Sequence, residues 1–280
     1  PVAPGVYAFI GETGARTRDN EGLNANIGLV VTPAGALLID SGATQQGARQ
    51  IHDAVKRVTT QPVRWVVNTG GQDHRWLGNG YFLAQGAELI GHEQGRADMQ
   101  TRGGEQLRAL AGVLGDRIDG TVPTLPTRWL RAPDETLRLP DTVVEIRHRG
   151  GAHTPGDLLV WLPQQRVLFS GDVVYMDRLL GVLPVSHTGR WMASLAELEA
   201  LAPAVVVPGH GRVTDLAGVR ADTRDYLQAL RAHMKKAVED AADIGEAIRS
   251  FDMKPYARLR NAADLHPGNA SRTYLELERE

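Results

Sequence analysis

Histidine and aspartate residues follow the ends of four Val-rich runs in this sequence. Each run leads through a short glycine-containing loop to side chains that can bind a metal or move a proton. These side chains are Asp73 and His74, His153, Asp172, and His210. Imidazole and carboxylate are the ligands that zinc and related ions accept when thiolate is absent, and the chain has no cysteine. The set therefore predicts a metal centre, and it excludes disulfides and a thiol nucleophile.

Each of these residues has a simpler interpretation when it is taken alone. Asp172 could cap a turn or a helix, and His210 could be a structural histidine with satisfied hydrogen bonds. The other histidines mostly take this structural interpretation. Two of them are kept as weaker candidates: His92 follows another strand, and His187 lies in a loop that would face the site. The metal prediction thus rests on the whole set.

Short strands and longer helices alternate along the chain, which predicts a layered α/β fold. The carboxyl ends of strands in such a sheet can share one edge, so we expect the histidines and aspartates to converge there. A hairpin is expected at residues 27–39, around Pro33-Ala34-Gly35. The other expected elements are helices at 46–58 and 190–201 and strands at 63–67, 142–146, 157–162, 166–169 and 204–207.

Two further segments bear on the domain organisation. Residues 102–128 contain five glycines and two prolines around a short predicted helix at 105–114, and we interpret them as a lid or a linker. Apolar residues at three- and four-residue steps after Asp215 predict one long amphipathic helix, which would pack on the sheet or form a homodimer interface. We therefore expect a domain at residues 1–215 and a C-terminal helical segment at 216–280 that packs on it.

Composition excludes several classes of protein. The 280 residues include 31 Lys and Arg against 33 Asp and Glu, so no basic field would attract nucleic acid or an anionic membrane. No run approaches the ~18 apolar residues of a transmembrane helix. The sequence begins at Pro1 with strand-like residues close behind, which favours a removed leader. A small-molecule substrate is the expected partner.

Taken in order, these motifs resemble the metallo-β-lactamase superfamily. Residues 26–42 are similar to its opening hairpin and Asp-x-Gly turn, and His153 lies in a segment close to its His-Thr-Pro-Gly motif. Asp172 corresponds to the bridging aspartate and His210 to the last metal histidine. The resemblance implies a four-layer αββα sandwich with zinc. The C-terminal helices resemble a periplasmic branch related to the sulfur-oxidation-associated and quinoprotein-relay zinc metallohydrolases, so we expect a periplasmic location, with the cytoplasm as the alternative.

The sequence departs from the family at its His-x-His-x-Asp-His motif, where residues 70–75 are Gly-Gly-Gln-Asp-His-Arg. Aligned without gaps, Gly70 and Gln72 replace two first-metal histidines, His74 takes the aspartate position and Arg75 takes the last histidine position. With a compensating deletion and insertion, the Asp-His pair stays intact. Both registers keep His74 near the metal, and both lose the three-histidine first site.

The remaining ligands suffice for one zinc ion, because a catalytic zinc needs three protein ligands and a water. A second ion would have to share Asp172 and recruit Gln72, so we expect one ion or an asymmetric pair. Zinc would lower the pKa of its water from about 15.7 toward ~7. Asp73, if it is not a ligand, would orient that water or take its proton. His187 or Arg75 would stabilise a developing oxyanion or bind an acidic group of the substrate.

The predicted function is a metal-dependent hydrolase that acts on a small ester, amide or lactam-like bond. The alternative is a degenerate, non-hydrolytic member that binds a ligand or a redox-cofactor partner, with its metal structural or absent; Gly70 and Gln72 favour this alternative. A serine hydrolase is excluded because Ser170 and Ser186 lie outside any Gly-x-Ser-x-Gly turn. The sequence also lacks the glycine-rich loop of nucleotide-binding P-loop proteins.

Overall fold

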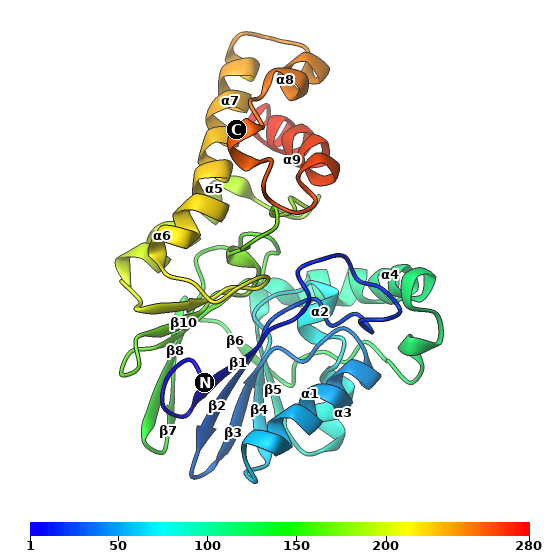
Figure 1. Ribbon diagram of the computed structural model, residues 1–280, viewed down its shortest axis with the longest axis vertical. Helices are drawn as coiled ribbons and strands as arrows, with labels where there is room; N and C mark the ends of the chain where they lie inside the picture. The colour runs from blue at the N-terminus through cyan, green and yellow to red at the C-terminus, as the bar shows by residue number, and fades with distance from the viewer.

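The computed structural model describes residues 1–280 and contains two β-sheets that lie face to face, with helices on their outer faces (Figure 1). The sheet orders are β1-β2-β3-β4-β5-β6 and β11-β10-β9-β8-β7. This is the αββα sandwich that the sequence predicts. The strands are β1 (Val6–Phe9), β2 (Ile27–Thr32), β3 (Gly35–Ile39), β4 (Val63–Val67), β5 (Glu88–His92), β6 (Arg128–Leu130), β7 (Asp134–Leu139), β8 (Thr142–Arg147), β9 (Leu159–Leu162), β10 (Val167–Phe169) and β11 (Val205–Val207).

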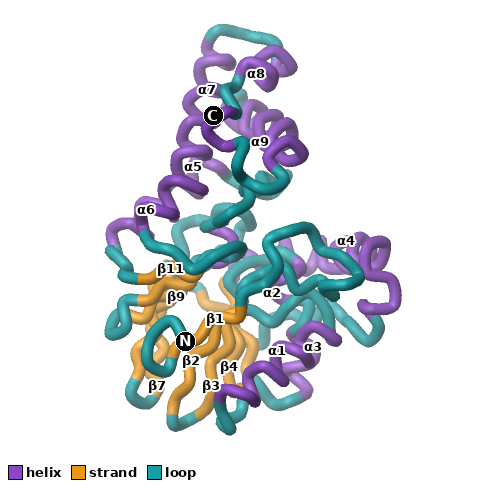
Figure 2. The backbone as a smooth tube through the Cα atoms, viewed as in Figure 1, coloured by secondary structure: helices purple, strands orange, loops and turns teal.

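The helices form two groups, one on the outer side of the first sheet and a second that extends beyond the other sheet (Figure 2). None of them combines the length and the apolar character needed to cross a bilayer. In chain order they are α1 (Gln45–Val58), α2 (Asp73–Trp76), α3 (Asn79–Ala84), α4 (Arg96–Leu114), α5 (Thr188–Ala200), α6 (Leu216–Val219), α7 (Asp225–Glu239), α8 (Ile244–Ser250) and α9 (Ala262–Leu277).

Three apolar clusters hold these layers together. Between the sheets, Leu37 of β3 belongs to one cluster with Phe169 of β10. The next residue, Leu38, points to the other face of β3, where it shares a cluster with Ile51 of α1. On the outer face of the second sheet, the third cluster contains Trp191 of α5. Since the first sheet is covered on both faces, β2 and β3 are almost entirely apolar.

The strand directions bring the polar loops to one edge of the sandwich. Strands β3 to β6 are parallel neighbours, and β10 is parallel to β11. Strand β8 runs in the same direction as β10, because both are antiparallel to β9. The residues that follow β4, β10 and β11 include His74, Asp172 and His210, whose ligand atoms meet in space. The predicted convergence at the carboxyl ends is therefore confirmed for these three residues.

The first part of the glycine-rich middle segment, up to Leu114, is helical and is not a lid or a linker. Helix α4 begins at Arg96, nine residues before the predicted start, and continues to Leu114. Gly103 explains why glycine occurs inside it: a Cβ there would lie 2.7 Å from the Trp76 ring. The missing side chain lets α4 pack directly on α2, the helical turn that carries residues 73–75 of the altered motif.

The C-terminal segment is helical and shares a core with the sandwich. The chain is helical from Leu216 to Glu239, with a π-helical turn at Arg220–Arg224, where the sequence predicts one long helix. Helices α7, α8 and α9 extend away from the sheets (Figure 1). A single apolar cluster nevertheless includes Leu168 of β10, Trp191 of α5 and Leu230 of α7. This continuous core couples the helical segment to the second sheet.

Replacing Leu230 by alanine tests this coupling. Leu230 is fully buried, so its truncation is expected to cost about 2–5 kcal/mol of unfolding free energy. Urea denaturation followed by circular dichroism should show one transition that moves as a whole. Leu275→Ala is the control, because Leu275 is 39% exposed and its truncation should change stability by less than ~0.5 kcal/mol. A separate early transition for the helices would contradict the shared core.

Candidate metal centre

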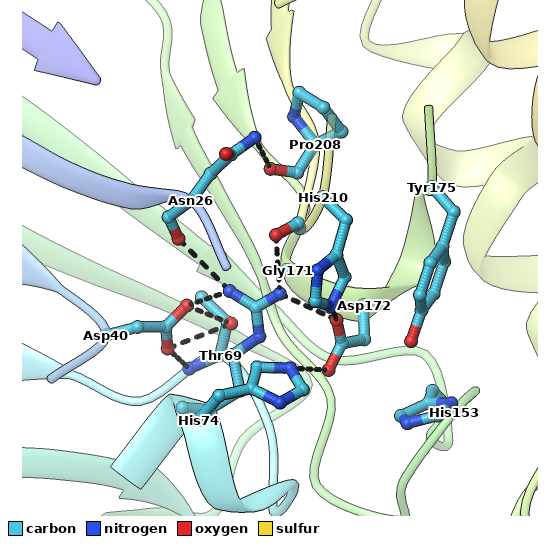
Figure 3. A network of polar contacts seen from close by, with 12 residues as sticks. Asn26, Asp40, Thr69, His74, His153, Gly171, Asp172, Tyr175, Pro208 and His210 are labelled. Carbon is cyan, nitrogen blue, oxygen red and sulfur yellow. Dashed lines mark hydrogen bonds and ion pairs between the residues drawn. The ribbon is translucent and has the colours of Figure 1, made fainter. Parts of the chain in front are cut away.

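Three ligand side chains converge at the carboxyl edge of the sandwich. Nε2 of His74 lies 3.0 Å from one carboxylate oxygen of Asp172, and Nε2 of His210 lies 3.2 Å from the other. The three ligand atoms lie within 4.8 Å of one another, and all three side chains are buried. Figure 3 shows both imidazole rings directed at the Asp172 carboxylate. The structure therefore brings together three of the predicted metal ligands.

Tight local turns place these residues. His74 lies on α2, a single helical turn that begins six residues after β4 ends. Asp172 lies in a short 3₁₀ turn after β10, where Gly171 has a φ of +48°. A Cβ at Gly171 would collide with the Thr69 side chain, so only glycine allows the β4 and β10 loops to approach this closely. His210 follows the Pro-Gly turn at the end of β11.

The outer nitrogen of each histidine faces a hydrogen-bond acceptor. Nδ1 of His74 lies 3.0 Å from Oδ1 of Asp73, and Nδ1 of His210 lies 2.7 Å from the carbonyl oxygen of Asn24. Nδ1 of His153 lies 2.8 Å from the carbonyl oxygen of Gly181. An acceptor at Nδ1 fixes the proton on that nitrogen, so Nε2 of a neutral ring is a lone pair. Metal-binding histidines are held in this way.

Burial keeps two of these rings neutral. It lowers the pKa of His210 to about 3 and that of His153 to about 4, although the Asp172 carboxylate acts in the opposite direction on both. Burial also acts to raise the pKa of Asp172, but Arg75 and His74 hold it well below the usual range. At neutral pH His210 consequently offers a neutral imidazole nitrogen and Asp172 an ionised carboxylate, the protonation states that zinc requires of these ligands.

This donor set fits one divalent ion. Imidazole nitrogens and carboxylate oxygens are the ligands that zinc accepts when thiolate is absent, and here they lie 3.0–3.2 Å from one another. His74, His210 and Asp172 supply the three protein ligands of a catalytic zinc site. His153 lies apart from these three, near the Tyr175 hydroxyl (Figure 3).

The region of the predicted first-metal histidines is filled by other side chains. A Cβ at Gly70 would lie 2.5 Å from Oδ1 of Asp157 and 3.2 Å from the Thr154 hydroxyl. Burial raises the pKa of Asp157 to about 8, and Thr154 binds both of its carboxyl oxygens. Gln72 precedes α2, and its buried Oε1 has no hydrogen-bond partner. No three-histidine site exists here.

Asp73 lies behind His74 and does not face the cluster. Its Oδ1 accepts hydrogen bonds from the backbone and the ring of His74, and its other oxygen pairs with Arg16. Both oxygens are thus occupied away from Asp172. The prediction that Asp73 binds the metal or takes a proton from its water is not supported by this position. Its geometry instead fixes the orientation of the His74 ring.

Arg75 is fully buried and cannot reach a substrate. One of its terminal nitrogens donates to Asp40 at 2.9 Å and the other donates to Asp172 at 2.6 Å. The same nitrogens also donate to the carbonyl oxygens of Asn26 and Gly209. The predicted role in stabilising an oxyanion therefore does not fit, because every terminal contact of Arg75 lies inside the protein.

His187 is not brought into the cluster either. It precedes α5, and its Nδ1 lies 3.0 Å from a carboxylate oxygen of Glu276 on α9. Together with α9 it lines a separate cavity of about 670 Å³. His187 lies in a loop, as predicted, but this loop faces the C-terminal helices and not the cluster. His92 stacks on His148, with ring centroids 3.8 Å apart, and likewise contributes no ligand to the cluster.

Two residues beside the cluster, Tyr175 and Asp40, were not among the predicted site residues. Tyr175 stacks on His210, with ring centroids 5.0 Å apart, and its ring lies 5.8 Å from that of His153. Asp40 is 1% exposed and receives hydrogen bonds from Thr69 as well as from Arg75. Its φ of +69° is strained for a residue other than glycine, which marks a position held by its surroundings. The available signal for Asp40 was its place directly after β3, whereas Tyr175 comes six residues after β10 and has no such signal.

Comparisons with known proteins agree with this architecture. A family model described as the metallo-beta-lactamase superfamily matches residues 20–210. The chain is 32% identical over 96 residues to a metallo-beta-lactamase type 2 of Bacillus sp. (strain 170), which is 33% of this chain and 37% of that protein. It is 32% identical over 92 residues to the acyl-coenzyme A thioesterase MBLAC2 of Gallus gallus, or 31% and 32% of the two chains. The matches thus span about a third of these relatives.

Solved structures share the fold over a longer range. A metallo-beta-lactamase from Pontibacter korlensis superposes with a TM-score of 0.56 at 25% identity, covering 70% of this chain and 83% of its own. The DIM-1 metallo-beta-lactamase exposed to ceftazidime has a TM-score of 0.62 at 18% identity, covering 79% and 91% of the two chains. At the latter identity the likeness concerns the fold alone.

Asp157→Asn tests the neutral carboxyl group in the filled first site. The folded protein keeps a proton on Asp157 up to about pH 8, whereas the unfolded chain releases it near pH 4, so the native residue costs stability as pH rises between these values. Asparagine cannot titrate. After metal chelation, the variant should gain stability relative to the native chain by up to about 1.4 kcal/mol per pH unit.

Urea denaturation at several pH values measures this gain, with Asp53→Asn as the control for an exposed aspartate. A constant difference between Asp157→Asn and the native chain from about pH 5 to 8 would show that Asp157 is ionised in the folded protein.

Proposed function

Because this chain belongs to the metallo-β-lactamase superfamily, we propose that it is a metal-dependent hydrolase with a single ion held by His74, Asp172 and His210. The observation that carries the proposal is the convergence of two imidazole Nε2 atoms and one carboxylate within 4.8 Å. In addition, both Nδ1 atoms face acceptors.

The surrounding residues prepare this centre for hydrolysis. A bound zinc ion would polarise a carbonyl group and lower the pKa of a water molecule toward ~7. Asp73 fixes the His74 ring, and the Asn24 carbonyl oxygen fixes the His210 ring, so neither ligand has to reorient when substrate arrives. Asp172 supplies the negative charge that attracts a divalent cation into this buried position.

We propose Tyr175 as a residue that acts on the substrate, because its ring lies beside those of His210 and His153. Burial raises the pKa of its phenol well above the usual value, so the hydroxyl keeps its proton at neutral pH. That hydroxyl points toward His153 at the border of the cluster (Figure 3). We assign to Tyr175 the donation of a hydrogen bond to the oxygen that gains charge during attack on a carbonyl group.

The contacts of His74 and Arg75 favour the ungapped register of the altered motif. Both side chains reach the Asp172 carboxylate, as the aspartate and last histidine positions of the family motif should. Gly70 and Gln72 then stand at the first-metal histidine positions, where Asp157 fills the space. This register supports one ion at the second position of the family site.

The proposed substrates are small carbonyl compounds with an ester, amide, thioester or lactam bond. The notion of a thioester or lactam comes from the relatives, which are named as a thioesterase and as β-lactamases. The matches cover only about a third of those relatives, so the substrate is a proposal. A periplasmic location is proposed from the resemblance of the C-terminal helices.

His210→Ala should remove one of three ligands and abolish metal binding. Metal content should fall from about one zinc per chain to near zero, and kcat/KM on generic ester and lactam substrates should fall at least ~100-fold. Elemental analysis and a spectrophotometric hydrolysis assay measure the two effects. His52→Ala is the matched control, because His52 contacts Tyr81 on the helical face of the first sheet.

The two measurements separate the competing interpretations. If zinc binds the native chain and is lost in His210→Ala, but none of the tested esters and lactams is hydrolysed, the result would favour a non-hydrolytic ligand-binding member. A native chain that takes up no zinc at all would contradict the proposed metal centre.

A further inference from the structure

The Arg75 guanidinium group lies in a buried compartment that is lined by carboxylate and carbonyl oxygens. The group contacts four acceptors, each from a different strand end. They are Oδ2 of Asp40 at 2.9 Å, the carbonyl oxygen of Asn26 at 3.2 Å, Oδ1 of Asp172 at 2.6 Å and the carbonyl oxygen of Gly209 at 2.9 Å. Figure 3 shows Asn26, Asp40 and Asp172 around this point. Carboxylate and carbonyl oxygens are the ligands of hard divalent cations.

The charges of this compartment require a cation. Asp40 and Asp172 are both 1% exposed, and each has a carboxylate oxygen that accepts a hydrogen bond from Arg75. A guanidinium group stays protonated in proteins, so it compensates two carboxylates that would otherwise be buried without a partner.

The surrounding backbone also fits a guanidinium group. A Cβ at Gly209 would collide with Nη2 of Arg75, so the glycine leaves space for that nitrogen. The planar group donates with both terminal nitrogens, each shared between one carboxylate and one carbonyl oxygen, which a lysine ammonium could not do. Oδ2 of Asp172, on the side of His74, receives no hydrogen bond from Arg75.

We propose that the Arg75 guanidinium is a resident substitute for a metal ion in an oxygen-lined compartment beside the proposed centre. It bonds one oxygen of Asp172 and leaves the other for the ion shared with His74 and His210. The part that concerns the shared ion rests on the proposed function; the compartment itself does not. Arg75 is a positioning residue in this scheme, because it touches a metal ligand and no substrate.

Emptying the compartment should create a site for a small cation. In Arg75→Ala the four oxygens remain, so zinc-loaded protein should bind about one Mn²⁺ per chain that the native protein does not bind. Electron paramagnetic resonance detects this binding directly. The melting temperature should fall by several degrees, and millimolar methylguanidinium should restore much of the loss, with sodium chloride as the ionic-strength control.

Three further variants keep the test decisive. Arg75→Gln is neutral and should gain Mn²⁺ binding even where the alanine variant does not fold, whereas Arg75→Lys retains a charge and should not. Arg16→Ala is the matched control, because it breaks the neighbouring ion pair with Asp73 and leaves the compartment filled. Equal Mn²⁺ binding by the native protein, Arg75→Ala and Arg75→Gln, with no response to methylguanidinium, would overturn the proposal.

The experiment distinguishes this proposal from the proposed function. A native chain that takes up no zinc contradicts the hydrolase centre. The differences in Mn²⁺ binding and in methylguanidinium response between native and variant chains can then be measured on zinc-free protein, and they still decide what Arg75 replaces.

Discussion

The arrangement of the carboxyl edge of the sandwich depends on the ion pairs of Arg75 with Asp40 and Asp172. The two carboxylates lie at the ends of strands in different sheets, β3 and β10, and both are removed from water. Leaving either one without its partner would cost several kcal/mol. The guanidinium therefore fixes the two sheets relative to each other at the point where the metal ligands project. The position of His74 is set in the same way, because His74 is the residue next to Arg75 on the single turn α2.

Segments outside the recognised sequence motifs hold the histidine side chains in place. The Asn24 carbonyl oxygen orients His210, and the Gly181 carbonyl oxygen orients His153. The Asn26 amide donates to the carbonyl oxygens of Pro208 and Gly211, which holds the β11 loop against the start of β2. The metal centre is consequently assembled by the backbone of both sheets. A fixed arrangement of this kind lowers the reorganisation that binding or catalysis would require.

Local patterns explain which parts of this structure were predictable. Val-rich runs followed by glycine identify strand ends, and strand ends at a parallel edge identify Asp172 and His210 as neighbours. Contacts between distant segments have no such pattern. Whether Arg75 points to a substrate or to Asp40 is decided by packing, and backbone carbonyl partners carry no sequence signal. The start of α4 was interpreted as part of a lid or a linker for the same reason, because Gly103 reflects contact with Trp76 and not flexibility.

The residues that replace the family's histidines in the altered motif fit their surroundings in this structure. Gly70 leaves space that Asp157 and Thr154 fill with satisfied hydrogen bonds, and Arg75 introduces a cation with four acceptors already in place. Random loss of ligands would leave buried acceptors and charges unpaired, at a cost of about 1–3 kcal/mol for each neutral group. Around this centre few buried atoms lack a partner, among them Oε1 of Gln72 and Nε of Arg75. The physical pattern is that of a rebuilt site, in which one region is closed with protein atoms and the other keeps a complete set of ligands for a single ion.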